Sequence, residues 1–207
     1  MENHIIRTSR IDNRAAFLNG KQYLKNENKP APEFFDSIYD RVSSSYPKYY
    51  KMDNLSKLGF LASEILLKGF DFADTKPEQT GVVLMNANSS LDTDLKYFQS
   101  TKEYPSPALF VYTLPNIVIG EICIRNGFKG ENAFFIAPSF DASFIADYVN
   151  YLINNNILHF CICGWADFLK DEYEVFLMLV TKRSDNDASA LLFEKKNIEK
   201  LYRLDHG

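Results

Sequence analysis

The chain has 207 residues and a mass of 23.8 kDa, enough for one ordinary domain with a sizeable hydrophobic core. Its content of 46% hydrophobic and 24% charged residues is typical of a folded globular protein and excludes a disordered chain. A formal net charge of −4 and an isoelectric point near 5.4 argue against a nucleic-acid platform, which needs a concentrated basic surface, although an acidic carrier protein could still bind a local basic patch.

The sequence contains no segment typical of a signal peptide or a membrane span. The polar opening Met1–His4 is followed by the apolar pair Ile5-Ile6, which is too short for the core of a signal peptide. No uninterrupted apolar stretch is long enough to cross a bilayer. The 3 cysteines, an odd number, indicate free thiols in a reducing compartment. We therefore expect a cytoplasmic protein without a membrane span.

Strands and helices are predicted to alternate in the first part of the chain. In order, the patterns predict a strand at His4–Ile11, a turn at Asn19-Gly20, a polar loop at Asn26–Pro32, a helix through Phe34–Val42, a helix through Leu55–Leu66, a loop at Asp71–Gln79 and a buried strand at Gly81–Asn86. Asp53 or Asn54 is the expected N-cap of the second helix, and Pro32 suits the first turn of the first helix.

The second part of the chain continues this alternation and is predicted to finish with a hairpin. In order, we expect a helix at Leu91–Gln99, a helix after Pro107, a strand at Asn132–Ala137, a turn at Pro138–Asp141, a helix, an apolar strand ending near Trp165, two strands at Tyr173–Thr181 and Ser189–Glu194 joined by the polar loop Lys182–Asp187, and a short helix with a tail at Asn197–Gly207. The strand Asn132–Ala137 is almost wholly apolar, as expected for a strand covered on both faces.

This order of elements predicts an α/β fold. The sheet should be mixed, with helices on both faces and a C-terminal antiparallel hairpin. In such a layout a site lies outside the carboxyl ends of the strands, and the turn Pro138–Asp141 should lie there.

Several short segments match a known family in their order and spacing. They are Gly81–Leu84 (GVVL), Leu91–Asp94 (LDTD), Pro105–Pro107 (PSP), Tyr112–Asn116 (YTLPN), Gly120–Ile122 (GEI), Ile124–Gly127 (IRNG) and Gly130–Asn132 (GEN), preceded by Met52 and Leu55–Glu64. From about Met52 to Val180 the chain resembles the N-terminal half of β-ketoacyl synthases. The resemblance implies a thiolase-like fold, in which two related halves pack together around an active site. We expect residues 1–207 to form a single domain equivalent to the N-terminal half.

The resemblance also implies where a nucleophile would lie. The family carries a cysteine at the turn after the strand equivalent to Phe134–Ala137, and here that position holds Phe140, or Ser139 if the loop is shifted by one residue. The family's two active-site histidines belong to the second half of the fold, and this chain's three histidines, at positions 4, 159 and 206, do not fall on matching positions. Claisen condensation needs an acyl-holding thiolate and groups that stabilise a carbanion and an oxyanion. We therefore expect no ketosynthase activity from these residues, and no cofactor.

Ser139, Phe140 and Asp141 are the candidates for an acyl pocket, and each has a second interpretation. Ser139 could be a nucleophile, but its neighbours lack the glycines of a hydrolase elbow, and Ser139 or Ser143 would also suit a helix cap or first turn. Asp141 suits the positive end of the helix dipole. Phe140 either fills the space of a lost acyl pocket or shapes the acyl tunnel of a partner, as in the family's chain-length-factor subunits, which also lack the cysteine.

The cysteines and His159 favour structural roles. Cys161 and Cys163 should point the same way from a buried strand, and no further ligands occur at a recognisable metal spacing. We expect buried free thiols there and at Cys123, no metal, and a core or rim position for His159.

These observations lead to one main functional hypothesis and two alternatives. The main hypothesis is a non-catalytic, chain-length-factor-like accessory subunit in fatty acid, polyketide or aryl-polyene-type pigment biosynthesis. It would form a homo- or heterodimer, pairing with a full-length ketosynthase or an acyl carrier protein. The interface candidates are Phe134, Phe135 and Ile136, because the resemblance implies that their strand lies near the dimer interface of the thiolase fold. The alternatives are an acyl-thioester hydrolase or acyltransferase that uses Ser139, and a homodimeric acyl-binding module.

Overall fold

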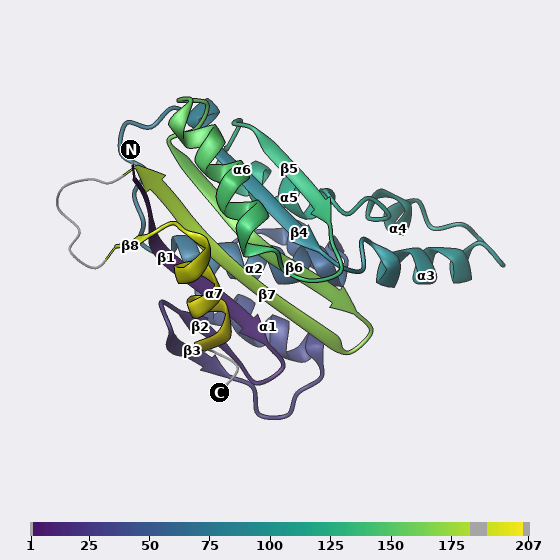
Figure 1. Cartoon of the computed structure of the whole chain (residues 1–207). Coiled ribbons are helices and arrows are strands. Elements are labelled where there is room, and N and C mark those ends of the chain that lie inside the picture. Colours follow the sequence, from purple (N-terminus) through teal and green to yellow (C-terminus); the bar gives the residue numbers. More distant parts are fainter. Residues whose placement is uncertain (1, 183–189, 205–207) are drawn as a thin grey trace.

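The computed structural model describes residues 2–182 and 190–204, whose strands form one mixed sheet (Figure 1). The strands are β1 (Asn3–Asp12), β2 (Ala15–Leu18), β3 (Lys21–Lys25), β4 (Thr80–Asn86), β5 (Asn132–Ile136), β6 (Phe160–Leu169), β7 (Glu172–Lys182) and β8 (Leu191–Leu192). Their order across the sheet is β3-β2-β1-β7-β6-β4-β5, with β8 beside β1. The predicted mixed α/β sheet is therefore confirmed.

The strand directions bring the carboxyl ends of β1, β4, β5 and β6 to the same end of the sheet. β4 runs parallel to both β5 and β6, so that Val83 lies between Ala133 and Cys163. β7 lies between β6 and β1 and is antiparallel to both. Since β1, β4, β5 and β6 all point the same way, the loops that follow them meet at one end, where ligands bind in many α/β proteins.

Helices cover both faces of this sheet, as predicted (Figure 1). They are α1 (Ala31–Val42), η1 (Pro47–Lys51), α2 (Asn54–Leu67), η2 (Pro77–Gln79), α3 (Leu91–Ser100), α4 (Pro107–Val111), α5 (Ile117–Asn126), α6 (Ala142–Asn154) and α7 (Lys195–Leu204). Helices α1, α2 and α5 contribute to one apolar cluster, and α6 and α7 contribute to the cluster on the other face. No helix in the described ranges is long and apolar enough to cross a membrane.

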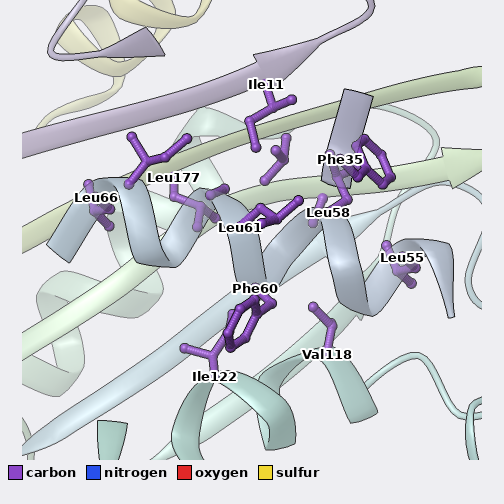
Figure 2. Packing of buried hydrophobic residues seen from close by; sticks show 14 of the residues in the cluster. Ile11, Phe35, Leu55, Leu58, Phe60, Leu61, Leu66, Val118, Ile122 and Leu177 are labelled. Atoms are coloured by element: carbon purple, nitrogen blue, oxygen red, sulfur yellow. The ribbon is translucent and has the colours of Figure 1, made fainter. Parts of the chain in front are cut away.

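Helix α2 is the centre of the first cluster (Figure 2). The side chain of its N-cap, Asp53, accepts a hydrogen bond from Ser56 N at 2.9 Å, which confirms one of the two predicted caps. Leu61 lies toward the sheet beside Leu177, and Phe60 points toward α5 (Figure 2). At Gly59 an added Cβ would lie 2.3 Å from Val118 Cγ2, so glycine permits the close approach of α2 to α5.

The chain contains the expected antiparallel hairpin, but it is formed by β6 and β7 and not by the two strands that were predicted. The predicted strand at 173–181 is part of β7, which forms its hairpin with β6 and lies inside the sheet. The short β8 pairs with β1 and not with β7, so the predicted pairing of Tyr173–Thr181 with Ser189–Glu194 is wrong. From residue 183 onward, the loop expected between these two strands lies outside the described residues. The reason is burial: the β7 residues from Val175 to Thr181 are buried throughout, which a strand between two neighbours satisfies and an edge strand does not.

The prediction that Asn132–Ala137 is covered on both faces holds only in part, because Phe134 and Phe135 pack against the clusters on opposite faces but stay half-buried. β5 is the last strand of the sheet, with an exposed Asn132, and Ile136 is 54% exposed. An apolar sequence indicates that a strand avoids water. It does not distinguish a strand that is buried within its own chain from one that is buried against another molecule.

Candidate functional site

The turn at residues 137–141 lies at the carboxyl end of the sheet, as predicted. Ala137 N donates a hydrogen bond to Asn86 O at 2.9 Å, which holds the start of the turn beside the end of β4. Asp141 is the N-cap of α6, and its Oδ1 accepts from Phe144 N at 2.9 Å. Asp141, and neither Ser139 nor Ser143, therefore caps this helix, while Ser143 lies in its first turn.

A surface pocket of about 460 Å³ opens next to this turn. It is lined by side chains from the ends of three parallel strands, from the start of β7 and from α7: Ala87, Asn88, Pro138, Ser139, Phe140, Trp165, Asp167, Leu169, Glu172, Tyr173, Glu174 and Tyr202. Two of the three acyl-pocket candidates, Ser139 and Phe140, thus share one hollow. Its lining contains three carboxylates and no basic side chain.

Phe140 is half-buried in a cluster of aromatic rings. Its ring centroid lies 4.8 Å from that of Tyr202, 6.2 Å from Phe176 and 6.3 Å from Trp165. The contacts come from β6, β7 and α7, so three elements hold the ring at the pocket wall. A side chain at this position occupies space between the turn and the C-terminal helix.

Asp167 organises the polar side of the pocket. Its Oδ1 accepts from Asn88 N at 3.0 Å and Ala87 N at 3.3 Å, and its Oδ2 accepts from Asn88 Nδ2 at 2.6 Å. These bonds tie the loop after β4 to the end of β6. The sequence analysis did not identify Asn88 or Asp167 as site residues. The available signal was their position, because each lies at or just past the end of an apolar strand.

A second polar group anchors α7 to the sheet. Arg10 is only 1% exposed; its guanidinium pairs with the Glu174 carboxylate, and its Nη1 donates to Tyr202 O at 2.9 Å. The Tyr202 hydroxyl donates to Glu174 Oε2 at 2.8 Å. Burial, and then the neighbouring Glu174 carboxylate, raise the pKa of the Tyr202 hydroxyl. The sequence offered no signal for this group, because its members are 164 or more residues from Arg10.

Ser139 is exposed, and its hydroxyl makes no hydrogen bond within residues 2–182 and 190–204. His159 precedes β6 and His4 lies near the start of β1, so both histidines lie at the opposite end of the sheet. Trp165, the first β6 residue in the pocket lining, lies six residues after His159, so roughly 20 Å of strand separates His159 from the pocket. His159 is exposed at the rim, one of its two predicted positions, and His206 lies outside the described residues.

The three cysteines are free thiols, as predicted. Cys161 and Cys163 are fully buried on the α6 side of β6, and burial raises the pKa of Cys163 well above its ordinary value. Cys123 is partly buried in α5, where burial raises the pKa of its thiol to about 11. In the described part of the chain, no three His, Cys, Asp or Glu side chains gather as metal ligands would.

Comparison with known proteins gives matches in three-dimensional structure only. No protein-family model and no curated protein sequence matches the chain. A structure of the ishigamide ketosynthase/chain length factor matches with a TM-score of 0.64 and 16% identity, over 90% of this chain and 64% of that one. The ketosynthase ApeO in complex with its chain length factor ApeC, from Xenorhabdus doucetiae, matches with a TM-score of 0.58 and 9% identity, over 89% of this chain and 81% of that one.

A third structure contains a type II polyketide synthase acyl-carrier protein in complex with its ketosynthase. It matches with a TM-score of 0.58 and 13% identity, over 88% of this chain and 63% of the matched one. This chain thus spans less than two thirds of the matched chain in two of the three structures. Identities this low establish the fold, and they confirm the predicted resemblance at that level: the chain has the thiolase-like fold of the N-terminal region of ketosynthases.

Proposed function

We propose that this protein is a non-catalytic accessory subunit of the chain-length-factor type, which assembles with a ketosynthase in fatty acid, polyketide or aryl-polyene-type pigment biosynthesis. The observation that carries the proposal is Phe140. Where the resemblance expects the nucleophile, this chain has an aromatic ring held by Trp165, Phe176 and Tyr202. A hydrocarbon ring cannot hold an acyl group covalently, whereas it can limit the space open to one.

The surroundings of Ser139 support the absence of acyl transfer. A serine nucleophile needs a base within hydrogen-bond reach. Of the pocket carboxylates, Asp167 is engaged by Asn88, and Glu174 by Arg10 and Tyr202. The third pocket carboxylate, Glu172, is exposed, and in the described part of the chain no hydrogen bond joins it to Ser139, so turnover at Ser139 would need Glu172 to move into reach or a base from outside the pocket.

The two edges of the sheet differ in a way that favours a partner at β5. At one edge, β3 carries exposed lysines at both ends, Lys21 and Lys25, and charged edge strands resist pairing with another chain. At the other edge, β5 has the sequence NAFFI and carries no charge. An uncharged apolar edge strand with free backbone groups is suited to pairing with a strand of a second subunit.

The three interface candidates do not form a single patch. Phe134 packs against the cluster of α2, Phe135 against the opposite cluster, and Ile136 is mostly exposed. Phe135 also contacts Phe144 and Tyr148 of α6, with ring centroids 4.7 and 5.2 Å away. Pairing along β5 would therefore use its backbone first, with the exposed ring of Phe144 and the half-buried ring of Tyr148 beside it.

The pocket lining argues against the acyl-binding alternative. Three carboxylates line its wall beside Phe140, Trp165 and Leu169, so the surface is mixed and not the mostly apolar one from which a bound acyl chain gains. No observation favours a homodimeric acyl-binding module over the accessory subunit.

Affinity purification of the tagged chain from its own cell, with mass spectrometry of bound proteins, tests the proposal. We expect recovery of a ketosynthase, and no acyl-thioester hydrolysis by the purified chain alone. Recovery of neither a ketosynthase nor an acyl carrier protein would contradict the accessory role. Hydrolysis that disappears in Ser139→Ala would establish the enzymatic alternative instead.

A further inference from the structure

Helices α3 and α4 project from the body of the molecule at the carboxyl end of the sheet (Figure 1). We call residues 91–114 the α3–α4 arm. Half of the exposed large apolar side chains in the described ranges belong to this arm. They are Leu91, Leu95, Phe98, Tyr104, Phe110, Val111 and Leu114, with exposed fractions of 41% to 87%.

The arm is held in a defined shape without burying these side chains. Ser90 Oγ donates to Thr113 O at 2.8 Å, which closes its base. Thr93 Oγ1 donates to Asp53 Oδ2 at 2.6 Å, which ties α3 to the N-terminus of α2. The rings of Tyr97 and Phe110 lie 5.5 Å apart and join α3 to α4. An apolar surface that is already arranged loses little conformational entropy when it binds.

The charge pattern of the arm favours a protein over a membrane. The charged residues of the arm are Asp92, Asp94, Lys96, Lys102 and Glu103, so the arm is net acidic with a charge of −1, and none of them lies in α4. Helices that lie on anionic membranes usually carry lysine or arginine on their polar face. The centre of a protein interface, by contrast, is depleted of charge and enriched in aromatic side chains.

The size of the β5 edge indicates which partner would cover the arm. Five residues span only about 17 Å, whereas a stable interface buries roughly 800 Å² on each partner. Asn86 is in register with Ile136, and the arm begins five residues after Asn86. The arm therefore starts beside the carboxyl end of β5 and would supply the apolar area that the strand lacks.

We propose that the α3–α4 arm is the apolar anchor by which this chain binds its ketosynthase, alongside strand pairing at β5. This inference rests on the proposed function, which names the ketosynthase as the partner. The two most exposed aromatic rings on its helices, Phe98 at 63% and Phe110 at 60%, are the expected central contacts. Anchor residues of this kind carry most of the binding energy of an interface.

The test compares binding of purified variants to the ketosynthase recovered with the wild-type chain. The double variant Phe98→Gln with Phe110→Gln should raise the Kd by about 30-fold or more. Leu191→Gln is the control, because Leu191 is 44% exposed in β8, which pairs with β1 away from β5, and its Kd should stay within about twofold. Thermal melting of all variants checks that the fold is retained, as expected for changes at exposed sites.

The possible results separate this inference from the proposed function. Failure of the wild-type chain to bind any ketosynthase would overturn both. Equal binding by the arm variant and the wild type would overturn the arm alone. Self-association or binding to phosphatidylglycerol vesicles that depends on Phe98 and Phe110, without ketosynthase binding, would assign the arm to another occupant.

Discussion

Phe140 links the turn after β5 to the C-terminal helix. Its ring contacts three other rings, and the closest belongs to Tyr202 of α7. The same helix is held on its polar side by the pairing of Arg10 with Glu174. Apolar and polar contacts at one end of the sheet thus fix the wall of the pocket on which the proposed function depends.

Truncation of Phe140 should cost stability. We expect Phe140→Ala to lower the free energy of unfolding by about 2 kcal/mol, less than the loss for a fully buried ring because Phe140 is half-buried. Urea unfolding followed by circular dichroism measures this, and Ser139→Ala, at an exposed neighbour, should change it by less than about 0.5 kcal/mol. A Phe140→Ala variant as stable as the wild type would show that the aromatic cluster contributes nothing.

The thiols should be protected in the native protein. Alkylation requires the thiolate, and burial raises the pKa of Cys123 to about 11 while covering Cys161 and Cys163 completely. We expect iodoacetamide at pH 8 to leave the native chain largely unmodified and to modify all 3 cysteines in urea, as measured by intact mass. Rapid native labelling of Cys161 or Cys163 would contradict the described burial.

Among the secondary-structure elements, the two edge strands differ most in what they allow. A lysine added to β5 should oppose pairing there, just as the lysines of β3 protect the other edge. We expect Ile136→Lys to weaken ketosynthase binding by about tenfold, while Gln22→Lys, which adds the same charge to β3, leaves it unchanged. Binding measured by calorimetry tests both variants, and equal loss in the two would point to a general charge effect.

The N-terminus of α2 joins the core to the α3–α4 arm through a single side chain. Asp53 caps α2 and accepts a hydrogen bond from Thr93 of α3. We expect Asp53→Ala to lower the free energy of unfolding by about 1–2 kcal/mol, because a cap and a partly buried acceptor are lost together. Asp53→Asn keeps an acceptor for the cap and should lower the free energy of unfolding by less in the same urea titration. A larger decrease for Asp53→Asn than for Asp53→Ala would refute this account.

For the molecule as a whole, buried tyrosines predict how stability depends on pH. Burial raises the pKa of Tyr173 to about 12, and burial together with nearby carboxylates also raises the pKa values of Tyr112 and Tyr202. In the unfolded chain these hydroxyls ionise near pH 10. Between about pH 10 and 12 the folded state therefore binds more protons than the unfolded state, so the contribution is intact below pH 10 and is lost as the pH rises.

Urea unfolding at a series of pH values tests this dependence. The free energy of unfolding should fall steadily above pH 10, and Tyr202→Phe should make the fall shallower because one raised pKa is removed. Tyr104→Phe is the control, since Tyr104 is 87% exposed and should leave the slope unchanged. A free energy of unfolding that is constant up to pH 12 would contradict the burial of these hydroxyls.

The predictions from sequence that the structure confirms depend on residues that are close together in the chain. The two-residue turn at Asn19 and Gly20 has φ values of 51° and 71°, which asparagine and glycine adopt readily. The Asp53 cap, the apolar strand β4 and the turn into α6 likewise depend on residues close together in the chain. The place of Phe140 and Ser139 at the carboxyl end of the sheet followed from that local order. The assignment of residues 1–207 to one domain remains a prediction.

Only the tertiary structure decided which elements are neighbours. It placed β7 inside the sheet, β5 at the edge and the α3–α4 arm outside the body, and it brought Arg10 to Glu174 and Tyr202. Apolar periodicity determines which side chains avoid water, because the free energy of transfer from water depends on the type of each residue and not on its neighbours. It does not determine what covers them, because that depends on contacts between distant segments and, at β5 and the arm, on the partner that we propose.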